Sequence, residues 1–509
     1  MSELILNFIL ALCPIILLII IMMGFKQPAW KAAIGAAILA AFEAFFFWHQ
    51  PIEVIGMSAL EGATMALWPI VVVIIAAVFT YNLVCSTGGM DVIKSMLKSV
   101  SADKRVLVIL VAWCFGGFME GMAGFGTAIA IPAGMLMAMG FDPLFSCLVC
   151  LVSNGFPTPW GSIGIPTITV VNLLGMSNSI DLSTFQVMQT GIFFVIIPFL
   201  LVVMTTKSFK ALKDMVWLCL GSGLGFVIPM FIVSKFVGAE LVVVIGSVCS
   251  LAITILLAKT VKPNPEYLME GPSGQTAKFT LKEALVACAP FIFIFIFLLS
   301  TSKLVLPIHT FLAQFASTVT FMSPTTFTWI NTPGVWIFLS AILGAIVQKA
   351  SFKQFKDVFI ATLKQMQGSI IVMVAVLAAA KIMIYSGMID AITAFAITVM
   401  QGAYPIIAPW LGMLGTFVTG SGTSSGVLFG QVQANAATAL ELNQSWIVGL
   451  NGLGVGVGKM LSPQSIAIAL SAVGGLKEDS KLLKMVLPYG VVFLIFTSII
   501  AFVGTSLVG

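Results

Sequence analysis

The stretch Gly116–Pro132, GGFMEGMAGFGTAIAIP, and a weaker copy of it at Gly415–Gly430, GTFVTGSGTSSGVLFG, decide the fold. Both lie within long apolar sequence, where a glycine costs a helix interior about 1 kcal/mol relative to alanine. A charge such as Glu120 costs about 3 kcal/mol at the centre of a bilayer. Membrane transporters that interrupt helices at matched positions in two halves place their binding site there. We therefore expect these two stretches to hold a small anionic substrate and a proton.

The composition excludes a soluble protein. Of the 509 residues, 60% are hydrophobic and 8% are charged, whereas a soluble domain carries roughly 25% charged residues. A membrane β-barrel would show short alternating segments, but here apolar runs of about 20 residues recur, each long enough to cross a bilayer as a helix. The chain is therefore predicted to be an all-α polytopic membrane protein. The predicted simple spans are 4–23, 32–50, 66–86, 187–206, 214–234, 239–258, 283–301, 334–348, 365–386 and 486–507.

The positions of lysine and arginine predict the orientation of these spans. Basic residues collect in alternate loops, which the positive-inside rule assigns to the cytoplasm. The loops between them, 51–65, 177–186, 302–333 and 390–405, are poor in lysine. This alternation places both termini outside. The polar stretch 260–282 is predicted to be a cytoplasmic linker between a first half, 1–259, and a second half, 283–509.

The two halves carry an internal repeat. Asn154-Gly155-x5-Gly161-x4-Pro166 recurs 297 residues later from Asn451 to Pro463, and Gly116-x3-Glu120-Gly121 recurs 299 residues later from Gly415. Gly88-x2-Asp91-x-Ile93 also recurs at an offset of 299. The matching loops carry opposite charge patterns, so the copies, about 50–175 and 349–475, are predicted to have inverted topology. Inverted repeats are typical of secondary transporters.

Segment lengths predict how the glycine-rich regions enter the membrane. Residues 106–120 form about 22 Å of helix at 1.5 Å per residue, less than the roughly 30 Å hydrocarbon core. We therefore expect re-entrant hairpins at 106–140 and 405–440. Residues 143–175 and 445–475 then form crossings broken at Asn154–Pro166 and Asn451–Pro463. Non-helical backbone at this depth must line a cavity or be buried in protein, so the tips and breaks should meet.

Two charged residues are the main candidates for chemistry. A carboxyl group in a dry, apolar setting can load and release a proton near physiological pH, so Glu120 is the predicted proton carrier. The alternative is a carboxylate held permanently by backbone amides or by a basic partner. Lys459 lies within the second break, where it could neutralise a substrate carboxylate or pair with Glu120. Its alternative is to extend toward the cytoplasmic face.

Polar groups near the breaks are predicted substrate ligands, together with backbone amides at half-helix N-termini, whose dipoles favour anions. Serine and threonine hydroxyls also commonly bond to their own helix, so only part of the set is expected to touch substrate. Glu43, Glu61 and Lys381 are not predicted site residues, because Glu43 is expected at the interface and Lys381 near the outer boundary. The predicted substrate-binding set is Gly121, Gly124, Phe125, Gly126, Thr127, Asn154, Thr158, Trp160, Ser162, Thr419, Gly420, Ser421, Thr423, Ser424, Asn451, Lys459, Ser462 and Gln464.

Four motifs resemble the bacterial L-lactate permease family: EGMAGFG at Glu120–Gly126, TGS at Thr419–Ser421, GKMLSPQSIA at Gly458–Ala467 and LWPI at Leu67–Ile70. The likeness runs over nearly the whole chain. It implies proton-coupled uptake of L-lactate and related acids, such as D-lactate and glycolate, across the bacterial plasma membrane. The family is similar to a superfamily of carriers with paired re-entrant hairpins, which implies an elevator-type movement. It also implies a multi-pass protein. The sequence leaves both a monomer and a homodimer open.

The chain departs from the family pattern in its second loop. The family usually reads TGSDT there, but Gly422 occupies the acidic position and Gly426 stands where asparagine is common. Glu120 is therefore expected to carry the proton without a second acid. A Na⁺-coupled carrier of mono- or dicarboxylates and an anion channel are the alternatives. No catalytic, metal, cofactor or nucleic-acid motif is found, so neither an enzyme nor a cofactor other than the coupling H⁺ is predicted.

Overall fold

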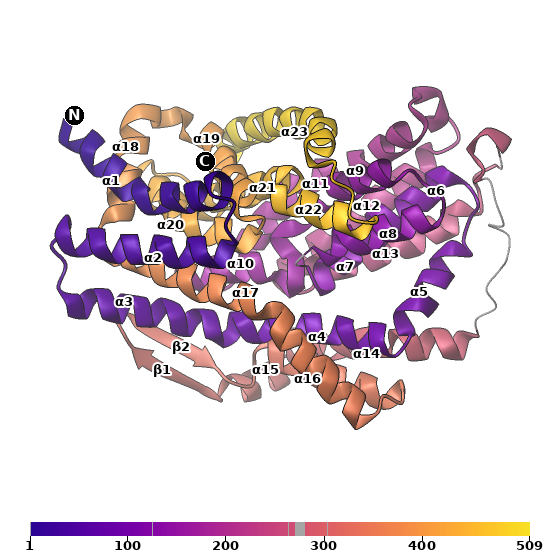
Figure 1. Cartoon of the computed structure of the whole chain (residues 1–509), viewed down its shortest axis with the longest axis horizontal. Helices are drawn as coiled ribbons and strands as arrows, with labels where there is room; N and C mark the ends of the chain where they lie inside the picture. The colour runs from indigo at the N-terminus through magenta and orange to yellow at the C-terminus, as the bar shows by residue number, and fades with distance from the viewer. Residues whose placement is uncertain (1, 125, 263, 270–279, 303, 509) are drawn as a thin grey trace.

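The computed structural model describes residues 2–508 except 125, 263, 270–279 and 303. The described chain is a bundle of helices with one small β-hairpin (Figure 1). Ten described helical segments are long and apolar enough to cross a membrane, and a bent pair would make an eleventh. The prediction of a polytopic α-helical membrane protein is confirmed.

The helices have the following bounds in chain order. They are α1 (Ser2–Ile19), α2 (Ala29–Phe46), α3 (Ile52–Met65), α4 (Val72–Ser86), α5 (Gly89–Lys98), α6 (Lys104–Val108), α7 (Gly116–Met122), α8 (Thr127–Ala138), α9 (Pro143–Asn154), α10 (Gly161–Leu173), α11 (Ile180–Thr206), α12 (Val216–Phe236), α13 (Val242–Ala258), α14 (Leu281–Thr301), α15 (Leu306–Ala313), α16 (Pro333–Val347), α17 (Phe352–Ser386), α18 (Met388–Met400), α19 (Tyr404–Thr419), α20 (Gly422–Ala439), α21 (Gln444–Leu461), α22 (Pro463–Ala472) and α23 (Asp479–Val508). Three π-helical segments, Ile20–Gly24, Ala66–Val71 and Ile109–Phe115, continue neighbouring helices, and 3₁₀ turns lie at Thr158–Trp160, Phe209–Leu212, Pro265–Tyr267 and Gln401–Ala403.

The helices pack in two outer groups around a central one. On one side, α17 packs along α2, α3 and α4, and α16 packs between α4 and α14. On the other side, α11, α12 and α13 pack in sequence and α19 packs against α21 and α23. Figure 1 shows α7, α8, α10, α20 and α22 between these groups. The short helices that the sequence interrupts therefore lie in the interior of the molecule.

Two loops that the charge pattern placed outside are helical. Most of 51–65 forms α3, and the chain then passes through Ala66–Val71, where Trp68 has non-helical backbone and kinks the path, into α4. Most of 390–405 belongs to α18 and the start of α19. The acidic residues suggested a loop at 51–65, but Glu61 is fully buried. Its charge is matched by a partner far away in the sequence, which a local hydropathy pattern does not record.

That partner is Lys381 of α17. Its Nζ lies 2.9 Å from Glu61 Oε1, and the Tyr385 hydroxyl donates to the same oxygen at 2.9 Å. Lys381 therefore forms a buried ion pair within the protein. Glu43, in the last turn of α2, is also buried, at 3% exposure.

The β-hairpin closes over this ion pair. Strands β1 (Ala316–Thr320) and β2 (Pro324–Thr328) pair antiparallel, with Ala316 opposite Thr328. The backbone N–H groups of Met322 and Ser323, at the tip, donate to Glu61 Oε2 at 3.1 and 3.3 Å. The hairpin, α3 and α17 thus share one buried charge network.

The prediction of a helix break over the whole of Asn451–Pro463 is wrong, because the observed break is much shorter. Helix α21 continues through Asn451 to Leu461, and the chain bends by 47° only at Ser462. The glycines within it allow close helix packing instead of unwinding. A Cβ on Gly454 would meet the Pro409 carbonyl and one on Gly458 the Met413 carbonyl, both on α19.

Replacing Gly454 by alanine should therefore separate α19 from α21. We expect a loss of about 1–3 kcal/mol or more, because extra volume in a closely packed interface forces the backbones apart. Thermal unfolding of the purified protein in detergent measures the change. Gly56→Ala is the matched control, since a Cβ there meets nothing within 4 Å. Equal midpoints for the two variants would contradict this account of the α21 glycines.

Candidate functional site

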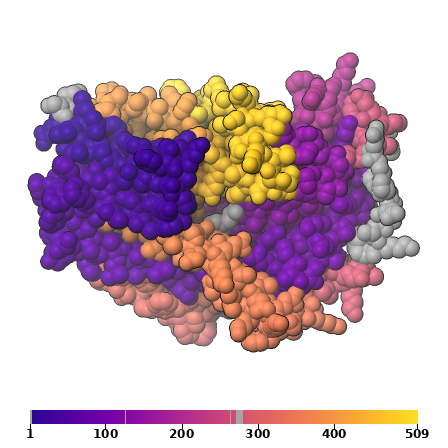
Figure 2. Space-filling view, in the orientation of Figure 1, coloured from indigo at the N-terminus to yellow at the C-terminus, as the bar shows by residue number. Residues whose placement is uncertain are grey.

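A cavity of about 340 Å³ lies at the centre of the molecule, where the interrupted helices converge. Figure 2 shows the surface hollowed where the N-terminal helices, α17 and the C-terminal segment meet. Eleven of the predicted site residues line this cavity, together with Gly161 and Gly422. They are Glu120, Thr127, Thr158, Ser162, Thr419, Gly420, Ser421, Thr423, Ser424, Lys459 and Gln464.

The other predicted site residues do not line the cavity. Gly121 lets α7 approach α13, since a Cβ there would lie 2.7 Å from a methyl group of Val244. The Trp160 indole is buried and donates to Ser183 Oγ at 2.8 Å, so it does not wall the cavity as expected. The remaining predicted residues outside the cavity lining are Gly124, Gly126, Asn154, Asn451 and Ser462, while Phe125 falls outside the described residues.

Three helix N-termini reach the cavity. Thr127 begins α8, Gly422 begins α20, and Gln464 is the second residue of α22. In the described part of the chain, the backbone N–H groups of Gly422 and Thr423 have no hydrogen-bond acceptor. Unpaired amides and the positive end of the helix dipole make such termini sites for anions.

Lys459 adds a full positive charge to these partial ones. Its side chain is 6% exposed, and its Nζ donates to the Gly420 carbonyl at 2.8 Å. Gly420 itself has a positive φ of 68° and packs against the Gln464 side chain. The ammonium therefore points into the turn between α19 and α20, and the alternative that it extends to the cytoplasmic face is wrong.

Glu120 lies in the last turn of α7, which ends at Met122, and is 3% exposed. Its carboxyl group packs on Gly161, where a Cβ would overlap Oε1. Within the described residues, Oε2 has no hydrogen-bond partner, although the Asn154 side chain lies beside the carboxyl group. Lys459 and Glu120 act on each other electrostatically across the cavity without forming a direct ion pair. Among the described residues, no basic side chain forms an ion pair with this carboxyl group.

Hydrogen bonding sorts the predicted hydroxyl ligands into two groups. Thr127, Thr158 and Thr419 donate to backbone carbonyls three or four residues earlier, at 2.7 to 2.9 Å. Ser162 donates across to the Ala123 carbonyl at 2.7 Å, so these four hydroxyls hold the turns in shape. Ser424 Oγ is buried without a partner among the described atoms. Its hydroxyl is therefore free to meet a ligand.

The first broken helix carries strained backbone at the cavity wall. Ser162, Ile163 and Gly164 have φ values of 46°, 58° and 78°. A β-branched residue with positive φ is unusual, and such conformations cost about 1–3 kcal/mol each and cluster at functional sites. Gly164 is required here, because a Cβ would lie 2.5 Å from the Ala239 carbonyl oxygen.

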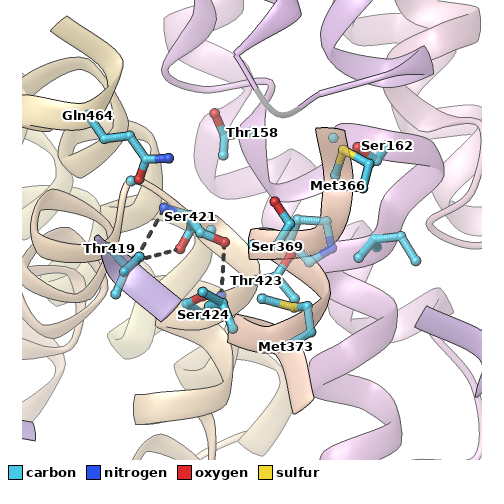
Figure 3. Close-up of a pocket in the computed structure, with 18 of the residues that line it drawn as sticks. Thr158, Ser162, Met366, Ser369, Met373, Thr419, Ser421, Thr423, Ser424 and Gln464 are labelled. Carbon is cyan, nitrogen blue, oxygen red and sulfur yellow. Dashed lines mark hydrogen bonds between the residues drawn. The ribbon is translucent and has the colours of Figure 1, made fainter. Parts of the chain in front are cut away.

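The cavity also has a wall that the sequence did not reveal. Helix α17 contributes Gln365, Met366, Ser369 and Met373, and α2 contributes Trp30. Figure 3 shows Met366, Ser369 and Met373 on the opposite side from Thr419 and Gln464. The one local signal was the pair Gly368-Ser369 within a long apolar helix, and nothing linked it to the glycine-rich turns.

The helices around the cavity pack crosswise between the two halves of the chain. Helix α8, which follows the first turn, packs against α22, and α20, which follows the second turn, packs against α10. Each turn thus lies against the broken helix of the other half. Gly88 and Gly387, matched in the repeat, both have left-handed backbone and precede α5 and α18.

The similarity to known proteins extends over nearly the whole chain. The profile of the L-lactate permease family matches residues 7–508. An L-lactate permease of Streptococcus iniae is 39% identical over 444 residues, which are 86% of this chain and 92% of the relative. An L-lactate permease of Halalkalibacterium halodurans is 31% identical over 504 residues, 96% of this chain and 95% of the relative. A glycolate permease of Escherichia coli (strain K12) is 29% identical over 542 residues, 97% of this chain and 94% of the relative.

Proposed function

The chain belongs to the L-lactate permease family, and we propose that it takes up L-lactate and related 2-hydroxy-monocarboxylates, such as D-lactate and glycolate, together with H⁺. As a member of that family it is a multi-pass transporter and not an enzyme, as the sequence resemblance implied. The observation that carries the proposal is one cavity lined by Glu120, by Lys459 and by three helix N-termini.

The anion site is the surface around the second turn. The Lys459 ammonium, the free amides of Gly422 and Thr423, and the Ser424 hydroxyl supply a positive charge and hydrogen-bond donors to a carboxylate. A cavity of about 340 Å³ is at the small end of ligand pockets, which span roughly 300–1,000 Å³. A compact monocarboxylate fits this size, whereas a dicarboxylate would call for a second cation at the site.

Charge balance accounts for coupling to a proton. With Glu120 ionised and Lys459 protonated, the empty site is neutral; with Glu120 protonated and an anion on Lys459, it is neutral again. Binding either the proton or the anion alone leaves one net charge, which costs about 3 kcal/mol at the bilayer centre. That cost corresponds to roughly a hundredfold penalty on the half-loaded forms. The family's acidic position is occupied by Gly422, so this balance rests on one acid and one base.

The crosswise packing supports the proposed repeat architecture. We infer two inverted repeats, about 50–175 and 349–475, with re-entrant hairpins at 106–140 and 405–440 and with both termini outside. A twofold relation of this kind would pair α8 with α22 and α20 with α10, as observed. Exposure of the cavity to alternate sides would then come from an elevator-type movement of the central helices in the plasma membrane.

Uptake into liposomes tests the function. Purified protein should accumulate labelled L-lactate above the external concentration when the outside is acidic, and an ionophore that collapses the pH gradient should abolish this accumulation. A Na⁺ gradient at equal pH should give none. Accumulation driven by Na⁺ alone would point to a Na⁺-coupled carrier, and conductance without uphill accumulation would point to a channel.

A further inference from the structure

The two sides of the cavity differ in chemistry. The side formed by the turns carries Glu120, Lys459 and hydroxyl groups. The facing side is mostly apolar and comes from other parts of the chain. Its apolar residues are Trp30 of α2, Val78 of α4, and Met366, Val372 and Met373 of α17. A molecule with a charged head and a small apolar tail would therefore have one orientation in this cavity.

The apolar side is built on one face of α17. Met366, Ser369 and Met373 are spaced three and four residues apart, so they lie in a row along the helix. Met366 and Met373 are each 3% exposed, so their side chains are packed in place. In Figure 3 this row faces the turn that carries Ser421. The wall has a fixed position relative to the rest of α17.

Ser369 differs from most hydroxyl residues of the helices. On the same helix, Thr362 donates to the Val358 carbonyl at 2.8 Å, which is the usual way to satisfy a hydroxyl in an apolar helix. The structure gives Ser369 no such bond within its described residues, and this side chain lines the cavity between the two methionines. It offers a donor and an acceptor in an otherwise apolar wall.

We propose that this face of α17 forms the second half of the substrate site and sets which 2-hydroxy acid is preferred. Met366 and Met373 contact the substituent on C2, and the Ser369 hydroxyl bonds the 2-hydroxyl group, while the carboxylate lies toward Lys459. The proposal rests on the proposed function, since it assigns parts of that same site. It assigns roles to residues that lie about 45–55 positions before the second turn and about 240–250 positions after the first.

The size of the expected effect follows from the apolar contact. One methyl group in a hydrophobic pocket contributes about 1–3 kcal/mol, or roughly 10–200-fold in specificity. The two methionines should therefore favour lactate, with its methyl group, over glycolate, which has none. A methionine side chain fills the space beside the substituent on C2. Replacing one methionine by alanine would open that space to a longer substituent.

Competitive uptake in liposomes measures this selectivity. Labelled lactate, glycolate and 2-hydroxybutyrate are offered together to the wild type and to Met373→Ala. The lactate-to-glycolate ratio should fall about tenfold in the variant, and the 2-hydroxybutyrate-to-lactate ratio should rise. Met373→Leu should stay near the wild-type ratios. Met188→Ala, which removes an exposed methionine of α11 outside the cavity, should change none of them.

Ser369→Ala tests the hydroxyl contact separately. It should reduce the preference for lactate over propionate, which lacks the 2-hydroxyl group, without changing the lactate-to-glycolate ratio. Unchanged ratios in Met373→Ala and in Ser369→Ala, with uptake intact, would overturn the proposal. If Met373→Ala yields no folded protein, Met366→Ala decides by the same ratio. Absence of lactate uptake by the wild type would instead refute the proposed function.

Discussion

Replacing Glu120 by glutamine should abolish lactate accumulation driven by a pH gradient but leave exchange of lactate across the membrane. Glutamine has nearly the same shape and stays neutral, so the variant mimics the protonated site. With lactate bound to Lys459, the site of the variant remains neutral, so the loaded site can still move across the membrane. Without lactate it carries the uncompensated Lys459 charge, so the empty return step should slow by roughly a hundredfold. Net uptake requires the return of the empty site, whereas exchange of lactate for lactate uses only the loaded site.

Counterflow separates the two activities. Liposomes loaded with unlabelled lactate should take up labelled lactate through Glu120→Gln, at a rate that no longer depends on pH. Glu53→Gln, which changes an exposed carboxylate in the first turn of α3, should behave as the wild type in both assays. If Glu120→Gln accumulates lactate in response to a pH gradient at the wild-type rate, Glu120 does not carry the coupled proton.

The glycine-rich turns were predictable because glycine, asparagine and proline act locally. The end of α7 at Met122 and the bend at Ser462 occur where the sequence combines helix breakers with apolar surroundings. Motif repetition then linked positions about 300 residues apart, so that Glu120 and Lys459 could be expected in one site. Both line one cavity.

The limits of prediction arise where a residue's role depends on its neighbour in space. Gly454 and Gly458 were predicted to lie in a helix break, yet both lie inside the continuous helix α21. Their lack of a side chain allows the backbone of α19 to pack close to them. Trp160 was predicted to bind substrate, but its indole donates to Ser183 and does not line the cavity. The α17 face was missed since its residues carry no sequence pattern that distinguishes them from any apolar span.

The same reasoning explains why the buried ion pair was not anticipated. Glu61 and Lys381 lie 320 positions apart, and each alone resembles a residue near a membrane boundary. Their pairing is coupled to a third element, because the Ser323 hydroxyl donates to Glu61 Oε1 at 3.1 Å and lies 2.9 Å from the Tyr385 hydroxyl. The network joins α3, α17 and the β-hairpin, and Lys381 lies eight residues beyond Met373, which lines the cavity.

Replacing Lys381 by methionine should therefore destabilise the protein by about 3–5 kcal/mol, since it leaves the Glu61 carboxylate buried without its counter-charge. The double variant Glu61→Gln, Lys381→Met should recover most of this loss. Its glutamine oxygen can still accept from the hairpin tip, and no unpaired charge remains. Replacing a whole buried pair by neutral groups of similar shape is often close to neutral.

Thermal unfolding in detergent gives the comparison. Lys94→Met is the matched control, because it removes a partner from the exposed pair with Asp91 at 3.1 Å, and such surface pairs contribute at most about 1 kcal/mol. A midpoint for Lys381→Met equal to that of Lys94→Met would show that the buried pair adds nothing to stability. A double variant no more stable than Lys381→Met would show instead that the Glu61 charge itself, and not its pairing, holds the hairpin on α3. The two results distinguish an ion pair that ties α17 to the hairpin from a carboxylate that binds the hairpin alone.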